Sequence, residues 1–413
     1  MQNVLIEKPY QFMPRFKPSW PQSLYCKWGL FKGSLNRIQG VSDCEIRNID
    51  RLRESLSAGH GIMLIPNHPR PADPMVMCYL VRQAPCNFYA MASWHLCNQG
   101  WFVKNVIRVM GAFSINREGL DRQAVDHAIE ILQTAERPLV IFPEGTTSRT
   151  NDQLMSLMEG PSFIARTAAK RRAKQNGGKV VVHPIGIKYL YQGDLKAACN
   201  PILSRIEKKL IWRPEPDMPL VERVTKVGNG LLTLKELEHG INEPIGTHRE
   251  RQTALVNRLL CPLEEEWLGS EQSEDGIAVR IKTLRMKIFP QMTRNELPQE
   301  ERKRRWKQLE DAYLAQQIDC YPENYVVDYP TVDRILETVE KFEEDLTDHC
   351  TVHGDLKVII DIGEPIEVGT QRVRRVTAAP LMTEIREKLE AKLLELQTES
   401  KIYQENQSPL VVH

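Results

Sequence analysis

Short apolar runs alternate with longer segments of helical period between residues 55 and 190. Apolar runs bounded by Gly, Pro or polar residues predict strands at 61–66, 87–92, 111–115, 138–142 and 179–187. Helical periodicity is clearest in 121–136, where three apolar side chains share one face: Val125, Ile129 and Leu132. The predicted helices cover 74–83, 96–109, 119–135 and 161–175. This alternation is typical of an α/β fold.

The pattern changes near residue 195. Strand-like runs almost vanish, charge rises, and helices are predicted at 250–267, 300–317 and 332–346. Strand character returns over 355–368, and 381–396 predicts a final amphipathic helix. We therefore expect an N-terminal segment at 1–54, an α/β core at 55–194, a helical insertion at 195–354, and a closing strand and helix of the core at 355–413.

Composition narrows the class of protein. The 413 residues are 41% hydrophobic and 26% charged, as in an ordinary soluble globular protein. Lys and Arg number 55 against 54 Asp and Glu, so no global basic field favours nucleic acid as a partner. No apolar run approaches the roughly 18 residues of a membrane-spanning helix, and the first residues lack the features of a signal peptide. An integral membrane protein and a classically secreted one are therefore disfavoured.

The cysteines and histidines give no sign of a metal centre. Nine cysteines are scattered along the chain with no Cys-x-x-Cys pair, which is typical of reduced thiols in a cytosolic protein. His349 and His353 are four residues apart, but their neighbours Cys350 and Asp355 supply no coherent third ligand. We expect no metal site.

The first candidate for chemistry follows the predicted strand 61–66. The sequence of residues 67–74 is Asn-His-Pro-Arg-Pro-Ala-Asp-Pro, and its prolines forbid a regular helix. Active-site groups favour loops at strand ends in open α/β sheets. A turn there can place the Asp73 carboxylate against one nitrogen of His68, the arrangement of a general base and its orienting partner. From this segment alone, a surface histidine in a proline-rich turn is the alternative.

The second candidate follows the strand 138–142 and reads Phe-Pro-Glu-Gly-Thr-Thr-Ser-Arg from 142 to 149. Gly145 permits unusual backbone angles, and the backbone amides, the hydroxyls and Arg149 suit a phosphate cradle. Glu144 is placed to hydrogen-bond an acceptor hydroxyl. The alternative is a glycine turn with exposed hydroxyls. Arg117 follows the strand at 111–115, and the alternative to a binding role for it is that of a solvated cation at a strand end. His183, in a buried strand, is interpreted as structural.

Together these blocks resemble, in order, the motifs of the glycerophosphate acyltransferase superfamily, which includes 1-acylglycerol-3-phosphate acyltransferases. The family signature is N-H-x-x-x-x-D, a G-x-x-F-I-x-R-like block, F-P-E-G-T and a Val/Pro-rich strand, and the resemblance covers residues 55–190. The segment Gly363-Glu364-Pro365-Ile366 resembles the closing G-x-P-I strand. Two positions depart from the pattern: Arg70 stands where Ser or Asn is usual, and Thr147 holds the place of an Arg. These departures leave the acceptor headgroup open.

The resemblance implies a mixed sheet flanked by helices, with a mostly helical insertion. It also implies transfer of a fatty acyl group from acyl-CoA or acyl-ACP, as co-substrate with no bound cofactor, to a glycerol-phosphate or lysophospholipid hydroxyl. His68 would be the base and Asp73 its orienting partner. The substrate-binding residues implied are Arg117, Glu144, Gly145, Thr146 and Arg149. Two alternatives stay open: the same chemistry on another lyso-lipid, such as a lyso-aminolipid or lysophosphatidylcholine, and a non-catalytic lipid-binding scaffold.

The N-terminal segment offers a way to reach such lipids. Residues 8–42 contain six bases, no Asp or Glu, and most of the early aromatic residues. Aromatic and basic side chains suit the headgroup region of an anionic bilayer. We expect a peripheral protein at the cytoplasmic, inner face of a membrane, with 8–42 as an interfacial anchor. The alternative is that these aromatic residues pack onto the core.

Overall fold

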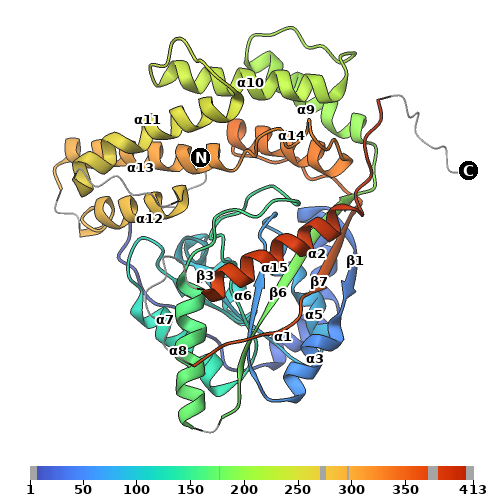
Figure 1. Ribbon diagram of the computed structural model, residues 1–413, viewed down its shortest axis with the longest axis vertical. Coiled ribbons are helices and arrows are strands. Elements are labelled where there is room, and N and C mark those ends of the chain that lie inside the picture. The colour runs from blue at the N-terminus through green and yellow to red at the C-terminus, as the bar shows by residue number, and fades with distance from the viewer. Residues whose placement is uncertain (1–6, 176, 270–275, 295–296, 371–379, 406–413) are drawn as a thin grey trace, which may run out of the picture. The chain divides into compact units, whose positions relative to one another are not determined.

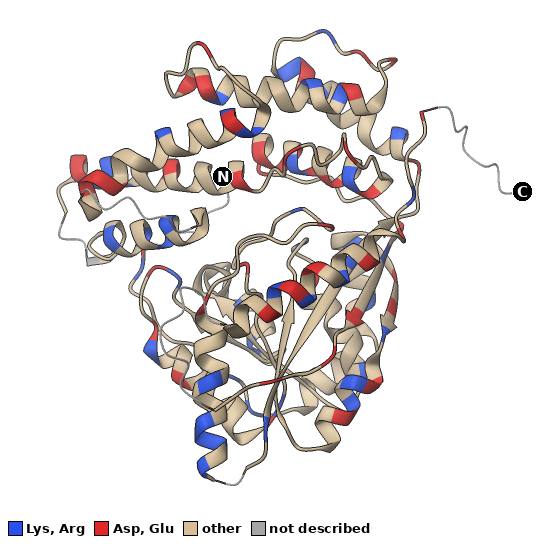
Figure 2. Cartoon of the chain, in the orientation of Figure 1, with Lys and Arg blue, Asp and Glu red and all other residues tan. Residues whose placement is uncertain are grey.

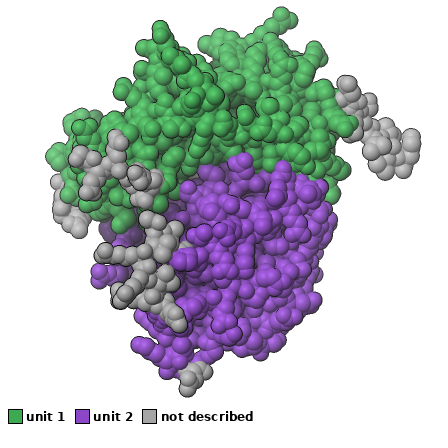
Figure 3. Space-filling model, viewed as in Figure 1, with its two compact units in different colours: residues 1–2, 191–353, 400–413 green, residues 3–190, 354–399 purple. Residues whose placement is uncertain are grey.

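The structure, a computed structural model, describes residues 7–175, 177–269, 276–294, 297–370 and 380–405. The chain forms two compact units, each described here by itself (Figure 3). The first, called the α/β unit, comprises residues 3–190 and 354–399. The second, called the helical unit, comprises 191–353 and 400–413 together with the first two residues.

An eight-stranded sheet in the order β1-β7-β6-β2-β5-β3-β4, with β8 paired to β6, forms the centre of the α/β unit. Its strands are β1 (Val41–Arg47), β2 (Gly61–Pro66), β3 (Tyr89–Ser93), β4 (Ala112–Ile115), β5 (Leu139–Val140), β6 (Val180–Tyr191), β7 (Leu356–Ile362) and β8 (Ile366–Glu367). Strands β2, β3, β4, β5 and β6 pair in parallel, and β8 is antiparallel to β6. The expected mixed α/β sheet is therefore confirmed. Every residue of β2 is buried, as its unbroken apolar run predicts for a central parallel strand.

Helices cover both faces of this sheet. They are α1 (Trp20–Lys27), α2 (Leu30–Gln39), α3 (Ile49–Ser57), α4 (Asp73–Val76), α5 (Cys78–Gln83), η1 (Trp94–Asn98), α6 (Trp101–Val109), α7 (Arg122–Thr134), α8 (Gly160–Lys174) and α15 (Pro380–Gln397). From β2 the chain moves toward one end of the sheet, through α5 to β3 and through α6 to β4. It then moves back in the opposite direction, through α7 to β5 and through α8 to β6. Right-handed crossovers therefore put α5 and α6 on one face and α7 and α8 on the other (Figure 1).

The main apolar core of the α/β unit lies between the sheet and the face formed by α7, α8 and α15. Leu132 of α7, Ala165 of α8 and Leu389 of α15 are completely or almost completely buried against β2 and β6 residues such as Met63 and Val182. This face explains the helical period that the sequence shows in 121–136.

Most predicted elements are confirmed, and the α/β unit differs from the prediction at the following places. The predicted helix 74–83 is divided into α4 and α5, and the predicted helix 96–109 is divided into η1 and α6. The second break lies at Gly100, whose φ of 120° a helix cannot contain. Strand β1 and helix α3 were not predicted, because the charged residues of 41–57 obscure their short apolar pattern.

The helical unit contains α9 (Leu195–Lys209), α10 (Leu220–Glu238), α11 (His248–Leu268), α12 (Ile277–Ile288), η2 (Met292–Arg294), α13 (Gln299–Asp319) and α14 (Val332–Thr347). Helices α9, α10 and α14 share a core that includes Leu203, Val227 and Leu336. Both charge signs are spread along these helices (Figure 2). Residues 400–405 also lie with this unit, where the Lys401 carbonyl accepts from the Val332 N–H at 2.9 Å.

A buried ion pair links α9 to α10 inside the helical unit. Arg223 of α10 binds both carboxylate oxygens of Glu207 at 2.7 and 2.9 Å, and neither side chain is more than 1% exposed. The side-chain oxygens of Asn200 and Ser204 accept two further N–H groups of the guanidinium. This satisfied geometry suits a structural role.

Among the helices that the structure describes, none is long and apolar enough to cross a bilayer.

Candidate active site

The predicted site residues follow the carboxyl ends of neighbouring parallel strands in the α/β unit. His68 follows β2, Glu144 follows β5, and Arg117 follows β4. Because parallel strands point the same way, these ends meet at one edge of the sheet, where ligands of open α/β proteins bind. The structure thus brings to one edge residues that are up to 76 positions apart in sequence.

His68 and Asp73 form the hydrogen bond that their spacing predicts. Nδ1 of His68 lies 2.7 Å from Oδ2 of Asp73, whose side chain is completely buried. The same carboxylate accepts from the Arg70 N–H at 2.9 Å and from the Tyr189 hydroxyl at 2.6 Å. A carboxylate that accepts from these donors also accepts from Nδ1–H, so the lone pair of the neutral imidazole resides on Nε2.

The Nε2 atom of His68 is available for chemistry. It makes no hydrogen bond with any residue that the structure describes, and the side chain keeps 15% of its surface exposed. The imidazole packs on the ring of Phe142, with a centroid distance of 4.3 Å and an interplanar angle of 30°. Packing on one side and the Asp73 bond on the other fix the ring, which is what a general base requires.

Asn67 holds this loop to the neighbouring strand. Its amide donates to the Ile187 carbonyl at 2.9 Å, and its carbonyl oxygen accepts from the Ile187 N–H at 2.7 Å. Asn67 is 1% exposed and lies just beyond the last paired residue of β2. Its side chain therefore replaces the backbone bonds that the ladder would otherwise make, and it fixes the position at which His68 leaves the sheet.

The two predicted motifs are joined by backbone hydrogen bonds. The His68 N–H donates to Oε1 of Glu144 at 2.6 Å, and the His68 carbonyl accepts from the Ser148 N–H at 3.0 Å. The Pro69 carbonyl accepts from the Arg149 N–H at 3.1 Å. Proline residues cannot donate, so this loop binds the second motif through the carbonyls of His68 and Pro69 and the N–H of His68. The two loops therefore form one structural element.

Glu144 is buried within this element. One carboxylate oxygen accepts from the His68 N–H, and the other accepts from the Met155 N–H at 3.0 Å. Burial raises the pKa of Glu144 to about 7, although both backbone N–H groups act to lower it. The carboxylate thus joins two loops, and its alignment of an acceptor hydroxyl stays a prediction.

The predicted phosphate-binding residues lie around the turn at Gly145. The Arg117 guanidinium donates to the Gly145 carbonyl, which joins the end of β4 to the second motif. Gly145 has a φ of 69°, and a Cβ atom there would lie 2.8 Å from the Met158 methyl group, so the turn requires glycine. Thr146 is half-buried, and Arg149 is buried with a φ of 58°. Phosphate binding by these residues stays a prediction.

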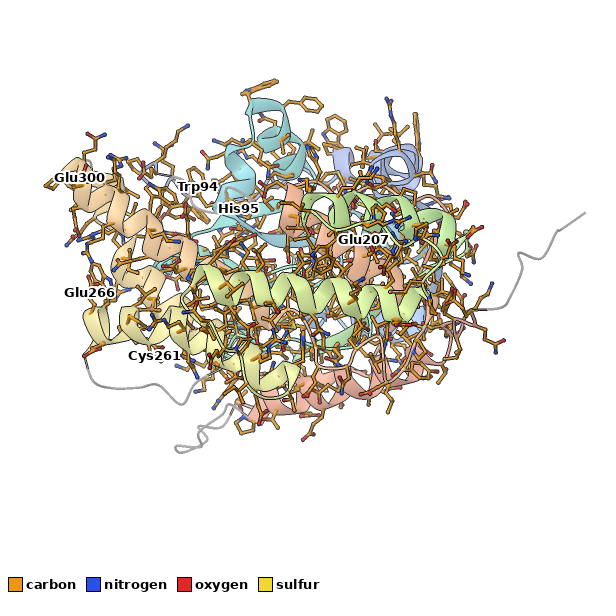
Figure 4. All side chains as sticks on the ribbon, turned by 90° about the horizontal axis from the view of Figure 1, so that it is seen from above. Trp94, His95, Glu207, Cys261, Glu266 and Glu300 are labelled. Carbon is orange, nitrogen blue, oxygen red and sulfur yellow. The ribbon has the colours of Figure 1, made fainter. Side chains whose placement is uncertain are left out.

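His95 is at this edge of the sheet but was not predicted. Ser93 and Ile115 are paired in the β3–β4 ladder, so His95 and Arg117 each stand two residues beyond a paired position. Nδ1 of His95 lies 2.8 Å from the Ser93 hydroxyl, and its neighbour Trp94 packs edge-on against Tyr10 (Figure 4). Burial, and then the charge of Arg117, lower the pKa of His95 to about 4. In the sequence, the feature that could have identified His95 is the polar Ser-x-His segment directly after a predicted strand.

Tyr189 was also missed, because it looks like an ordinary strand residue. Its hydroxyl contacts Asp73 from β6, and burial raises its pKa well above the ordinary value.

His183 has the structural role expected of it: its nitrogens bind the Ser55 hydroxyl at 2.9 Å and the Gly363 carbonyl at 3.0 Å. Within the described ranges, no group of three His, Cys, Asp or Glu side chains is placed to hold a metal ion.

Comparison with known proteins covers the same part of the chain. A family model described as Acyltransferase matches residues 44–188. The 1-acyl-sn-glycerol-3-phosphate acyltransferase of Streptococcus pneumoniae (strain ATCC BAA-255 / R6) is 31% identical over 112 residues, which are 26% of this chain and 38% of that protein. This chain therefore matches well under half the length of that relative. The matched family segment contains both motif loops and most strands of the sheet.

Proposed function

We propose that this protein, whose residues 44–188 match a family model described as Acyltransferase, transfers a fatty acyl group from an acyl thioester to the hydroxyl of a glycerophosphate-type acceptor. The observation that carries the proposal is the fixed imidazole of His68, with Nδ1 bound to buried Asp73 and Nε2 open. A hydroxyl needs such a base to attack a thioester, because it is a weak nucleophile when protonated.

The reaction proceeds without a covalent enzyme intermediate. Nε2 of His68 takes the proton of the acceptor hydroxyl while its oxygen forms a bond to the thioester carbonyl carbon. The positive charge that develops on His68 is stabilised by the Asp73 carboxylate at 2.7 Å. When the tetrahedral species collapses, the C–S bond breaks, and the imidazolium returns the proton to the leaving thiolate. The products are an ester and a free thiol, and the base is regenerated.

The acceptor phosphate binds at the turn that contains Gly145. Arg117, Thr146 and Arg149 supply the charge and donors there, and the backbone turn holds them at the same sheet edge as His68. The name of the Streptococcus pneumoniae relative indicates a lysophosphatidate acceptor for that protein. For this chain a 1-acylglycerol 3-phosphate is our first choice, and glycerol 3-phosphate and other lysophospholipids are the alternatives.

Arg70, which departs from the family pattern, contacts Asp73, the partner of His68. The backbone N–H of Arg70 donates to Asp73, and its guanidinium lies 5.4 Å above the Tyr189 ring, the same tyrosine that binds Asp73. Arg70 is 6% exposed. We therefore assign Arg70 to the support of the His68–Asp73 pair rather than to the acceptor headgroup.

The test is purified protein with acyl-CoA and acyl-ACP donors and a panel of acceptors, with products identified by mass spectrometry. The panel contains glycerol 3-phosphate, lysophosphatidate, lysophosphatidylcholine and a lyso-aminolipid. We expect a new ester on a phosphate-bearing acceptor and release of one thiol for each ester. Binding of lyso-lipids with no acyl transfer from either donor would instead make the protein a lipid-binding scaffold.

A further inference from the structure

Helix α1 turns an apolar stripe toward solvent. Trp20, Leu24 and the C-cap residue Trp28 are spaced by four and are 68%, 39% and 74% exposed. The opposite stripe, Gln22 and Cys26, is completely buried. A surface helix usually has the reverse arrangement, with its apolar side inward. The exposed side of α1 therefore has a hydrophobic surface with no partner in the α/β unit among the residues that the structure describes.

Helix α6 has the same property in a stronger form. Six of its nine residues are large and apolar, yet none of the nine, all of which the structure describes, is buried. Trp101, Phe102 and Val106 are 80%, 72% and 40% exposed. Large apolar side chains gathered in this way, in contrast to single ones, are typical of an interaction surface.

The two helices are joined on one face of the sheet. The amide of Gln22 in α1 donates to the carbonyl of Met110, directly after α6, at 2.7 Å, and to the carbonyl of Phe88 at 3.1 Å. In Figure 4 the ribbons of α1 and α6 lie along the same side of the α/β unit. We define the aromatic face as the exposed residues of both helices, namely Trp20, Leu24, Trp28, Trp101, Phe102 and Val106.

The two segments that carry the aromatic face contain charges of one sign. These segments, 8–42 and 74–117, contain ten Lys and Arg and no Asp or Glu, in a chain whose net charge is +1. Some of these bases are internal, as Arg15 is, but Lys17, Lys27, Lys32 and Arg82 are exposed. Tryptophan and phenylalanine with lysine and arginine are the residues that bind the headgroup region of an anionic bilayer.

The aromatic face also leads to the candidate active site. Strand β3 ends at Ser93, and α6 begins after η1 and returns to the start of β4, so α6 runs opposite to both strands. Trp101 and Phe102 are therefore in the turn of α6 nearest to the carboxyl edge of the sheet, where His68 and Arg117 lie. A bilayer against α6 would meet the rim of the site.

We propose that the aromatic face is a docking surface for an anionic lipid bilayer, and that docking presents the site edge to a membrane-embedded acceptor. The second half of this statement rests on the proposed function, and the first half does not. This proposal narrows the earlier expectation that the whole of 8–42 is the membrane anchor. Phe31 is completely buried and Phe12 packs against the core, so within 8–42 the exposed stripe of α1 would contact the membrane. Helix α6 would supply the other part of the contact.

The test is co-sedimentation with vesicles of phosphatidylcholine alone and of phosphatidylcholine with phosphatidylglycerol. The variant is Trp101→Ser/Phe102→Ser, and the control is Phe163→Ser, which removes a 60% exposed phenylalanine from α8 at the other face of the sheet. We expect anionic vesicles to bind the wild type and the control, salt to weaken that binding, and the double variant to bind at least about tenfold more weakly, since it loses two interfacial aromatic residues.

Binding and catalysis are separated by measuring sedimentation also with the His68→Ala protein, which should bind vesicles as the wild type does. Circular dichroism and thermal unfolding should be the same for the double variant and the control. Equal sedimentation of the double variant and the Phe163→Ser control would overturn the proposal. So would an aromatic face that binds an acidic acyl carrier protein but no vesicle of either composition.

Discussion

Replacing Asp73 by Asn removes one charge while it keeps the shape of the side chain. The Asn oxygen can still accept from His68 Nδ1–H and the Arg70 N–H, and the new amide can donate to the Tyr189 hydroxyl, which rotates to accept. The fold should therefore survive. What is lost is the attraction between the carboxylate and the imidazolium formed during the reaction. For unit charges about 4 Å apart at an effective dielectric constant near 20, this is about 4 kcal/mol.

That loss corresponds to a fall of about 10³-fold in kcat, since about 1.4 kcal/mol is tenfold in rate. The assay is steady-state transfer from acyl-CoA to the best acceptor of the panel, with the acceptor KM measured in the same experiment. We expect KM to change little, because the charge acts on the transition state. The double variant His68→Ala/Asp73→Asn should be little slower than His68→Ala, because the pair acts as a unit.

A matched control is Asp361→Asn, which alters a buried carboxylate of β7 that accepts from Lys392 at 2.7 Å and Asn48 at 2.6 Å. This substitution should lower thermal stability and leave kcat of the folded protein unchanged. An Asp73→Asn enzyme that turns over within about threefold of the wild type would refute the electrostatic role, since the worked loss is about 10³-fold.

Four further outcomes follow from the site. Tyr189→Phe leaves one Asp73 oxygen without its donor, a cost of about 1–3 kcal/mol, so kcat should fall about tenfold with KM unchanged in steady-state assays. Gly145→Val forces a φ of 69° on a branched residue beside Met158. The acceptor KM should therefore rise, and denaturation should show a free energy of unfolding lower by about 1–3 kcal/mol. Arg117→Ala should raise the acceptor KM at least about tenfold and spare the donor KM, which product-formation kinetics with each substrate varied will check. Burial raises the pKa of Glu144 from 4.5 to about 7 in the folded protein. A carboxyl with a raised pKa stabilises the fold at low pH, so this contribution falls by about 3 kcal/mol as the pH rises from 4.5 to 7. Denaturation of the wild type and of Glu144→Gln should therefore show that the stability advantage of the wild type shrinks from pH 5 to pH 8.

The sequence predicted those parts of the site that are local. His68 and Asp73 are five residues apart in a loop that prolines keep from becoming helical, so their contact follows from the segment itself. The strands that carry the site were visible as buried apolar runs, such as β2. Local patterns of this kind also predicted α7, whose apolar side chains share one face against the sheet.

The parts that the sequence did not predict depend on contacts across the fold. Tyr189 binds Asp73 from 116 residues away, and nothing around a tyrosine in an apolar strand identifies its partner. Both oxygens of the Glu144 carboxylate accept backbone N–H groups of other loops, contacts that the motif alone does not identify, and its alignment of an acceptor hydroxyl stays a prediction. The aromatic residues of 8–42 were treated as one set, but tertiary packing buries Phe31 and exposes Trp20.

The central claim is that His68 is the base of an acyl transfer, and single-turnover acylation of a lyso-acceptor by the wild type and by His68→Ala tests it most directly. Product ester is quantified by mass spectrometry, and thermal unfolding is recorded for both proteins. The account predicts an unchanged unfolding transition and a rate lower by about 10²–10⁴-fold, the usual cost of a lost general base. A folded His68→Ala protein that forms the same ester at the rate of the wild type would contradict the account.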